Sequence, residues 1–300
     1  MRNWSKNQPG SLLNWVKLGG LSKLDNSTLG AIMRRDLHGR RILITGASSG
    51  IGRCLAEQLA QLGAHVAMAA RSKDKLGELE ASLKSRNLDA FAVAADVTVE
   101  EDRRRLIEQT AQQFGGLDVL VNNAGVASWA HFAHSTESIL RHIMEANFFA
   151  PAELIRLAIP ILVEGEQPAI VNVGSMCGRR GMPAWSEYSA SKFALSGLSE
   201  ALRAELARFD IDVLLVLPGL TRSEFSRHLL QSAGRLKIDF TAGMPPEQVA
   251  GHIVRVLQKN VTESVVGREA RWMLRCQRFF PRLLDRLIAR RVRKLYESTE

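Results

Sequence analysis

The chain has 300 residues, 46% of them apolar, which is ample for a large hydrophobic core, yet no run approaches the ~20 consecutive apolar residues of a membrane-spanning helix. Its three cysteines show neither a Cys-x-x-Cys spacing nor a cluster with histidines, which argues against a disulfide framework and a bound metal. The net charge is +9, but residues 268–300 hold ten Lys and Arg against four Asp and Glu, so most of it lies near the end of the chain.

Residues 1–38 precede the first clear pattern and are predicted to form an N-terminal extension. Charges, prolines and glycines interrupt this segment, so a cleaved secretory signal is not expected. Its scattered apolar residues predict a short amphipathic arm that folds over the body or a partner subunit, or that contacts a membrane surface. They are Trp4, Leu12, Leu13, Trp15, Val16 and Leu18.

From residue 41 onward, short apolar runs alternate with segments of helical periodicity. Strands are predicted at 41–45, 65–70, 90–95, 117–122, 169–173, 211–217 and 264–266. Helices are predicted at 51–62, 73–86, 99–114, 136–163 with bends near Pro151 and Pro160, 246–260, and in a segment ending near 209. Continuously apolar strands separated by helices indicate an α/β fold, a single Rossmann-type doubly wound parallel sheet of about seven strands with helices on both faces.

Ligands of such sheets bind beyond the carboxyl ends of the strands, and the first of these ends carries a glycine-rich loop. Residues 45–52 read Thr-Gly-Ala-Ser-Ser-Gly-Ile-Gly and lie between the first strand and the first helix. Gly46, Gly50 and Gly52 permit a tight turn and close approach to a phosphate, and the helix N-terminus favours a pyrophosphate. The spacing Gly-x-x-x-Gly-x-Gly differs from the common Gly-x-Gly-x-x-Gly.

The residues after the second and third strands indicate which dinucleotide binds. A carboxylate after the second strand would bind a free ribose hydroxyl, but residues 69–72 read Ala-Ala-Arg-Ser. Arg71 can pair with a 2′-phosphate, so the sequence favours NADP(H) over NAD(H). Asp96 can accept a hydrogen bond from the adenine amino group, and the alternative for Asp96 is a helix N-cap, for which Thr98 is equally suited.

Residues 188–192 read Tyr-Ser-Ala-Ser-Lys, which places Tyr188 and Lys192 one helical turn apart on the same face. An ammonium beside a phenol favours the phenolate, so we expect Lys192 to lower the pKa of Tyr188 from its usual ~10 and to suit it to proton transfer. Ser175 follows the fifth predicted strand, where it can hold a substrate oxygen against Tyr188.

These pieces together resemble the short-chain dehydrogenase/reductase family over roughly residues 39–267. The resemblance is carried by the glycine loop and by Asp96, the Asn-Asn-Ala-Gly run at 122–125, Asn147, Ser175, Tyr188, Lys192, and Pro218-Gly219 with Thr221. It implies that Tyr188 is the acid/base, that Lys192 binds the nicotinamide ribose, that Ser175 bonds the substrate oxygen and that Asn147 holds a relay water. It also implies a set of cofactor-binding residues: Gly46, Ser48, Ser49, Gly50, Ile51, Gly52, Arg71, Asp96, Val97, Asn123, Ala124, Gly125, Tyr188, Lys192, Pro218, Gly219 and Thr221.

The predicted function is therefore an NADP-dependent oxidoreductase that transfers a hydride between the nicotinamide and an alcohol or ketone. The family resemblance makes residues 222–244 a specificity lid, and apolar residues there and at Trp129, Phe132, Met182 and Trp185 favour an apolar substrate such as a lipid, steroid, retinoid or aromatic carbonyl. Two alternatives stay open, namely an NADP-binding redox sensor without turnover and a non-redox epimerase or lyase.

Residues 268–300 are predicted to be a basic amphipathic helical tail, with Pro281 as a break or a helix start. Arginines recur there every three or four residues between apolar side chains. The tail is expected to pack on the body or a second subunit, or to dock on an anionic membrane surface, and nucleic acid is the least favoured partner. We expect a homodimer or homotetramer, located in the cytoplasm and, in the membrane alternative, peripheral on the membrane's cytoplasmic face.

Overall fold

A computed structural model describes residues 35–222, 229–234 and 239–297 of the chain. The described residues belong to one compact unit, Arg34–Glu300. The apolar residues of the predicted N-terminal arm, and Phe225, Leu236 and Ile238 of the predicted lid, lie outside the described residues. Among the helices of the described ranges, none is both long and apolar enough to cross a bilayer.

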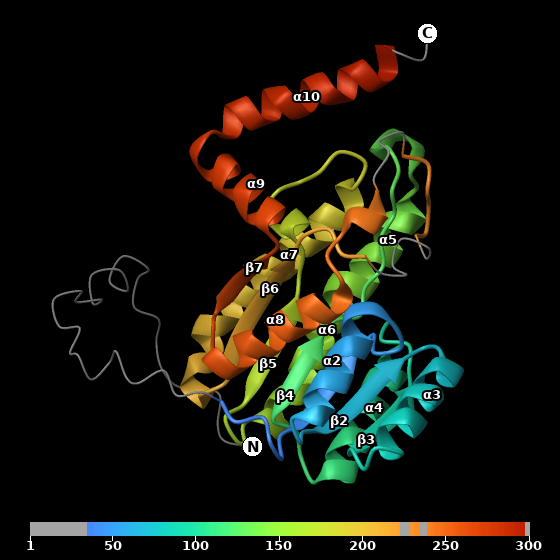
Figure 1. Cartoon of the computed structure of the whole chain (residues 1–300), viewed down its shortest axis with the longest axis vertical. Helices are drawn as coiled ribbons and strands as arrows, with labels where there is room; N and C mark the ends of the chain where they lie inside the picture. Colours follow the sequence, from blue (N-terminus) through green and yellow to red (C-terminus); the bar gives the residue numbers. More distant parts are fainter. Residues whose placement is uncertain (1–34, 223–228, 235–238, 298–300) are drawn as a thin grey trace, which may run out of the picture. The chain divides into compact units, whose positions relative to one another are not determined.

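Seven parallel strands form the central sheet, in the order β3-β2-β1-β4-β5-β6-β7 (Figure 1). The strand order reverses between β1 and β4, which are neighbours, so this is the switch point where a ligand is expected. The strands are β1 (Arg41–Thr45), β2 (His65–Ala70), β3 (Ala90–Ala94), β4 (Val119–Asn122), β5 (Ala169–Val173), β6 (Asp212–Pro218) and β7 (Glu263–Val266).

Helices cover both faces of the sheet because successive side chains of each buried strand point to opposite faces. Ile42 and Ile44 of β1 pack in one core with α2, α3 and α8, whereas Leu43 packs in a second core with α4 and α6. The predicted doubly wound fold is thus confirmed. The helices are α2 (Gly50–Gln61), α3 (Lys73–Lys84), α4 (Glu100–Phe114), α5 (Glu137–Met144), α6 (Ala150–Leu162), α7 (Ser186–Leu206), α8 (Pro246–Lys259), α9 (Arg268–Phe279) and α10 (Pro281–Glu297).

The predicted long helix over 136–163 is interrupted, and the interruption places a predicted site residue. A π-helical turn, η2 (Glu145–Phe149), joins α5 to α6 and contains Asn147. Pro151 follows directly and has no N–H to donate to the carbonyl of Asn147, so the α-helical hydrogen bond is missing there. The other boundaries differ from the prediction by a few residues at most, and Pro281 begins α10 rather than breaking a helix.

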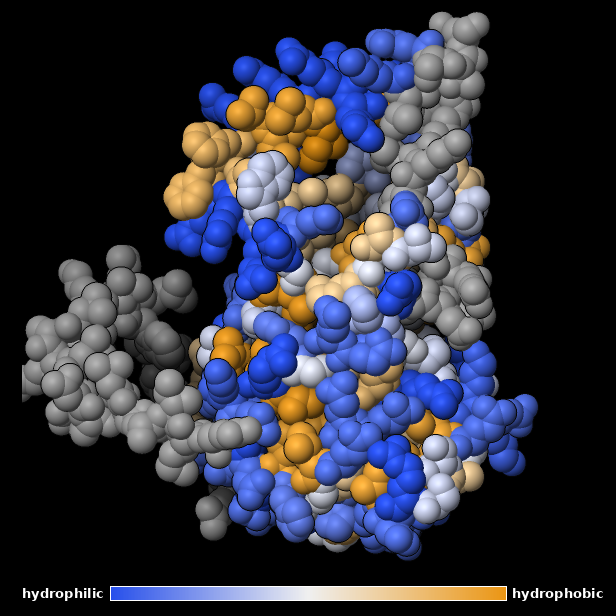
Figure 2. Space-filling view, viewed as in Figure 1, coloured by the Kyte–Doolittle hydropathy of each residue, from blue (hydrophilic) through white to orange (hydrophobic). Residues whose placement is uncertain are grey.

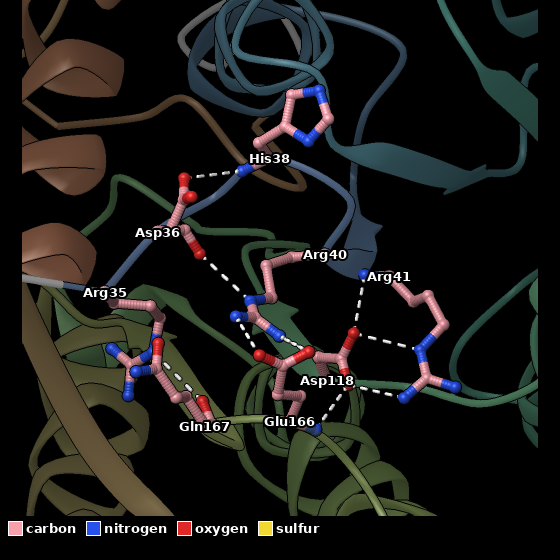
Figure 3. Close-up of polar contacts among 8 residues, drawn as sticks. All are labelled: Arg35, Asp36, His38, Arg40, Arg41, Asp118, Glu166 and Gln167. Carbon is pink, nitrogen blue, oxygen red and sulfur yellow. Dashed lines mark hydrogen bonds and ion pairs between the residues drawn. The ribbon is translucent and has the colours of Figure 1, made fainter.

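Arginines of the segment that enters β1 hold carboxylates at the amino edge of the sheet, opposite the predicted site. The pairs are Arg35–Asp212, Arg40–Glu166 and Arg41–Asp118. Figure 3 shows Asp118 at the centre, where both of its oxygens accept from the Arg41 guanidinium and one also accepts from the backbone N–H of Glu166. Burial alone would raise the pKa of Asp118, but these hydrogen bonds outweigh burial and hold it below its ordinary value.

Candidate active site

The predicted site residues gather at the carboxyl edge of the sheet because every strand is parallel. Arg71 follows β2, Asp96 follows β3, Asn123 follows β4, Ser175 follows β5 and Gly219 follows β6. Residues separated by more than a hundred positions in the sequence therefore share one edge, on either side of the switch point between β1 and β4.

The glycine loop fits a dinucleotide phosphate by its backbone shape. Gly46 has φ +67°, and a Cβ on it would lie 2.8 Å from the Cα of Ala124. A Cβ on Gly52 would lie 2.3 Å from the carbonyl oxygen of Gly46, so neither position accepts a side chain without moving backbone. Ser49 is the N-cap residue of α2 and makes no side-chain capping bond. The first turn has no acidic residue, which leaves a helix N-terminus suited to an anion.

Asn123 and Thr45 hold the glycine loop against β4. The Asn123 side-chain amide donates to the carbonyl oxygens of Thr45 and Gly46, at 2.9 and 3.1 Å. The Thr45 hydroxyl accepts from the N–H groups of Asn123 and Ala124, both at 3.1 Å. Asn123 is one of the predicted cofactor-binding residues, and in this structure its side-chain amide faces the glycine loop. Thr45 begins the glycine motif, but its position in the motif gave no sign of this bracing role.

Arg71 and Asp96 lie at the ends of neighbouring strands and interact electrostatically. Arg71 is exposed beyond the buried end of β2. One carboxylate oxygen of Asp96 accepts from the Thr98 N–H and hydroxyl, at 2.9 and 2.7 Å. Burial works against the charged form of Asp96, yet these bonds, with a smaller contribution from Arg71, lower its pKa. Asp96 thus caps a turn, and the N-cap position of α4 itself belongs to Val99.

Tyr188 and Lys192 lie one turn apart on α7, as the spacing predicts. The Lys192 ammonium nitrogen is 5.8 Å from the centroid of the Tyr188 ring and donates to the carbonyl oxygen of Val173 at 3.0 Å. Lys192 is only 4% exposed, and burial lowers its pKa to about 8. The carbonyl oxygen at the end of β5 therefore helps to hold the ammonium beside the Tyr188 ring.

The expected lowering of the Tyr188 pKa is wrong for the protein's own groups. Burial raises the pKa of the phenol above its ordinary value, the Cys177 thiol adds to that rise, and a hydrogen bond with Ser175 acts in the opposite direction without overcoming burial. The physical reason is that removing a phenolate from water costs more than one hydrogen bond returns. Tyr188 is accordingly a protonated phenol at neutral pH.

Ser175 lies where β5 gives way to a loop, as predicted, and its hydroxyl faces Tyr188. It is 8% exposed and also accepts a hydrogen bond from the backbone N–H of Cys177 at 3.1 Å. This bond uses an acceptor site of the hydroxyl oxygen and leaves its proton for donation toward Tyr188 or toward a ligand beside it. Ser175 and Tyr188 thus form a pair of hydroxyl donors at the carboxyl edge.

Asn147 connects the π turn to the helix that carries Tyr188. Its amide makes reciprocal bonds with the backbone of Val126, at 2.8 and 2.9 Å, and donates to the Ser191 hydroxyl at 2.9 Å. Ser191 donates in turn to the carbonyl oxygen of Tyr188 at 2.8 Å. A Cβ on Gly125 would lie 3.0 Å from the Asn147 side-chain oxygen and 3.7 Å from the Lys192 nitrogen, so Gly125 occupies the gap between them. The sequence prediction missed Ser191, although it lies within the Tyr-Ser-Ala-Ser-Lys run.

Aromatic rings from three separate segments form a chain of ring contacts that begins at Tyr188. Trp185 lies 5.6 Å from Tyr188 and 6.3 Å from Phe240, and Phe240 lies 6.5 Å from Trp129, all between ring centroids. Phe240 belongs to the predicted lid, whose described residues therefore reach the neighbourhood of Tyr188. The rings form an apolar wall beside the hydroxyl pair.

The loop after β6 borders a separate cavity of about 710 Å³, lined by Gly219, α8, β7 and the start of α9. The residues lining this cavity include neither Tyr188 nor Ser175, so it is distinct from the hydroxyl pair. The Thr221 hydroxyl donates to the carbonyl oxygen of Gly219 at 3.2 Å and shapes the same loop.

Comparison with known proteins agrees with this geometry. The family model described as short chain dehydrogenase matches residues 40–233. The chain belongs to the short-chain dehydrogenase/reductase family. Members of this family are oxidoreductases that use a nicotinamide cofactor, and the glycine loop, the open N-terminus of α2 and the hydroxyl pair fit that chemistry.

Similar short-chain dehydrogenases come from bacteria, plants and animals. The uncharacterized oxidoreductase YxnA of Bacillus subtilis is 36% identical over 82% of this chain and 70% of its own length. The 11-beta-hydroxysteroid dehydrogenase A of Sesamum indicum is 38% identical over 71% of this chain and 61% of its own length. A Burkholderia phymatum short-chain dehydrogenase/reductase, crystallised in complex with NAD, shares the fold with a TM-score of 0.76 and 22% identity, over 83% of this chain and 96% of that one.

Proposed function

We propose that this protein is an NADP-dependent oxidoreductase that reduces an apolar ketone or aldehyde, or oxidises the corresponding alcohol. The observation that carries the proposal is the hydroxyl pair of Ser175 and Tyr188, which lies at the same sheet edge as a glycine loop shaped for a dinucleotide. Neither feature alone specifies the reaction. Together, the hydroxyl pair would provide the proton donor and the glycine loop would bind the dinucleotide that donates the hydride.

In this proposal the residues polarise and protonate a carbonyl oxygen. A bound reduced nicotinamide supplies the hydride. Ser175 and Tyr188 donate hydrogen bonds to the oxygen as negative charge develops on it, and Tyr188 then gives up its proton. Because burial raises the pKa of Tyr188, the phenol is held in the protonated state that reduction requires. The Lys192 ammonium lies against the Tyr188 ring. Asn147 donates to Ser191, which donates to the carbonyl oxygen of Tyr188, and these bonds help to hold α7 in place.

The preference for NADP is part of the proposal and is supported by Arg71. The residues at the end of β2 are Ala69, Ala70 and Arg71, without a carboxylate to bind a free ribose 2′-hydroxyl. The exposed Arg71 guanidinium offers a fork of donors for a 2′-phosphate. The Burkholderia phymatum relative was crystallised with NAD, which makes NAD the alternative to test here.

Replacing Arg71 by aspartate tests the cofactor preference. We expect Arg71→Asp to reduce kcat/KM for NADPH by at least about 100-fold, because a phosphate partner is lost and a repelling charge is gained. The same variant should leave NADH use nearly unchanged or improve it. Steady-state kinetics with both cofactors provide the measurement, and Arg86→Asp, an exposed charge change after α3, is the matched control. Equal losses for both cofactors would contradict the preference.

The substrate class is proposed from the aromatic wall of Trp129, Trp185 and Phe240 beside Tyr188. Such a wall favours flat or bulky apolar groups over sugars and small acids. The Sesamum indicum relative is named a hydroxysteroid dehydrogenase, which is compatible with this class. Following NADPH absorbance against steroid, retinoid, aromatic and aliphatic carbonyls, with aldoses as the polar comparison, would identify the class.

The alternatives are separated by the same assay. A redox sensor would bind NADPH without consuming it, and an epimerase or lyase would convert its substrate without net cofactor oxidation.

Members of this family commonly form oligomers, and we propose a homodimer or homotetramer, which light scattering during size-exclusion chromatography would test. The cytoplasmic location stays a prediction.

A further inference from the structure

Helices α9 and α10 carry a concentration of exposed apolar side chains that the proposed reaction does not use. Five large apolar residues there are more than half exposed, and we call them the tail patch: Trp272, Phe279, Phe280, Leu283 and Leu287. Figure 2 shows apolar side chains gathered over the junction of the two helices, with hydrophilic side chains on either side. Contiguous apolar surface bordered by charge is typical of an interaction site rather than of ordinary solvent-facing surface.

The tail patch faces solvent, whereas other residues of the same two helices are buried against the body. Ala270 of α9 and Leu284 of α10 are 2% and 8% exposed. The guanidinium of Arg180 reaches from the loop after Ser175, where it bonds Gln277 of α9 at 2.6 Å and Asp285 of α10 at 2.7 Å. Leu283 and Leu287, one turn apart on α10, are more than half exposed, so the described residues leave them largely uncovered.

Arginines border the tail patch on both helices. Arg282, Arg286 and Arg290 recur at four-residue steps along α10, and Arg275 and Arg278 occupy the last turns of α9. Within the described part of the chain, none of these five forms an ion pair with a carboxylate; the one described aspartate of α10, Asp285, pairs with Arg180. Within the described residues, this surface therefore carries positive charge that no carboxylate neutralises.

We propose that α9 and α10 dock on an anionic membrane surface, with the tail patch inserted at the level of the lipid headgroups and the arginines on their phosphates. An amphipathic helix with aromatic and leucine residues beside arginines has the composition that is typical of helices that bind anionic membranes. A second copy of the chain is a poorer occupant, because a symmetric contact through this face would bring the same unpaired arginines together. The proposal goes beyond the oxidoreductase activity and does not depend on it.

Docking in this way would orient the catalytic edge toward the lipid. Helix α9 begins directly after the carboxyl end of β7, so both terminal helices extend from the edge that holds Ser175 and Tyr188 (Figure 1). Arg180 ties them to the loop that follows Ser175. An apolar substrate dissolved in the bilayer would then enter the site without crossing water.

Flotation of the full-length chain with vesicles tests the proposal directly. The probes are vesicles of phosphatidylcholine alone and vesicles in which about one third is phosphatidylglycerol. Two double variants address the two components: Leu283→Ser with Leu287→Ser, and Arg286→Gln with Arg290→Gln. Their matched controls change exposed residues on the body: Leu62→Ser with Val163→Ser, and Arg141→Gln with Arg156→Gln. Circular dichroism and analytical ultracentrifugation monitor folding and oligomeric state.

We expect the wild-type chain and both controls to float with the anionic vesicles and to stay unbound with phosphatidylcholine alone. Each basic side chain at an anionic surface contributes roughly a fivefold increase in partition, so the arginine pair should lower binding roughly 25-fold, and high salt should do the same to the wild type. The leucine pair should lower binding at any salt concentration. Absence of wild-type flotation, or variants that bind as well as their controls, would overturn the proposal. So would a wild-type oligomer that the leucine pair dissociates while vesicle binding is absent.

Discussion

The carboxylate of Asp118 is only 2% exposed, and it accepts hydrogen bonds from the Arg41 guanidinium and from the backbone N–H groups of residues 41 and 166. Its pKa in the folded protein lies below the ordinary value of ~3.9 in an unfolded chain. The stabilisation is therefore complete above pH ~4 and is lost as the pH falls through the folded-state pKa, because protonation then favours the unfolded chain.

Asp118→Asn should lower the free energy of unfolding at pH 7 by about 2 kcal/mol, because a charged acceptor of several hydrogen bonds becomes a neutral amide. The difference from wild type should shrink as the pH is lowered below ~4. Urea unfolding across this pH range measures both effects. Glu100→Gln, which removes an exposed partner of Arg104 on α4, is the control and should change stability little. A deficit of Asp118→Asn that stays constant with pH would contradict the assigned role of the charge.

At the scale of elements, the side chain of Arg180 bridges α9 and α10 to the body and adds to the buried contacts of Ala270 and Leu284. Arg180 contacts both helices, while its neighbour Arg179 pairs with Glu200 and Glu263 of the body. Arg180→Met should increase amide hydrogen exchange in α10, since the pair with Asp285 is lost, and should leave the global unfolding free energy within about 1 kcal/mol of wild type. Arg179→Met is the matched control. Equal exchange in α10 for both variants would show that Arg180 does not fix the helix.

The helices and strands that the sequence predicted are those whose apolar pattern can be read within one short segment of the chain. Each strand is a continuous apolar run and each helix repeats its apolar residues every three or four positions, so their locations follow from the residues alone. The π turn at Glu145–Phe149 was not foreseen, because the apolar periodicity continues through it. Only the prolines at 151 and 160 gave a sign of irregularity, and they did not specify its form.

At the scale of the whole molecule, the parallel sheet explains why separate motifs form one site. Because all strands run in one direction, the glycine loop, Arg71, Asp96, Ser175 and Gly219 were each predictable as strand ends. Features that need tertiary contacts were not predictable. The Asn147–Ser191 link and the packing of Phe240 on Trp185 join segments distant in sequence. The pKa of Tyr188 was mispredicted because burial, which the spacing of Tyr188 and Lys192 does not reveal, dominates it.

The central claim is that the phenol of Tyr188 provides the proton for a hydride transfer, and Tyr188→Phe tests it most directly. With a carbonyl substrate found in the panel, NADPH oxidation should fall by at least about 100-fold, since a positioned acid contributes 10²–10⁴-fold. NADPH binding, followed by the fluorescence of the reduced nicotinamide, should be retained because the glycine loop and Arg71 are untouched. A Tyr188→Phe variant that binds NADPH and reduces the carbonyl at the wild-type rate would contradict the claim.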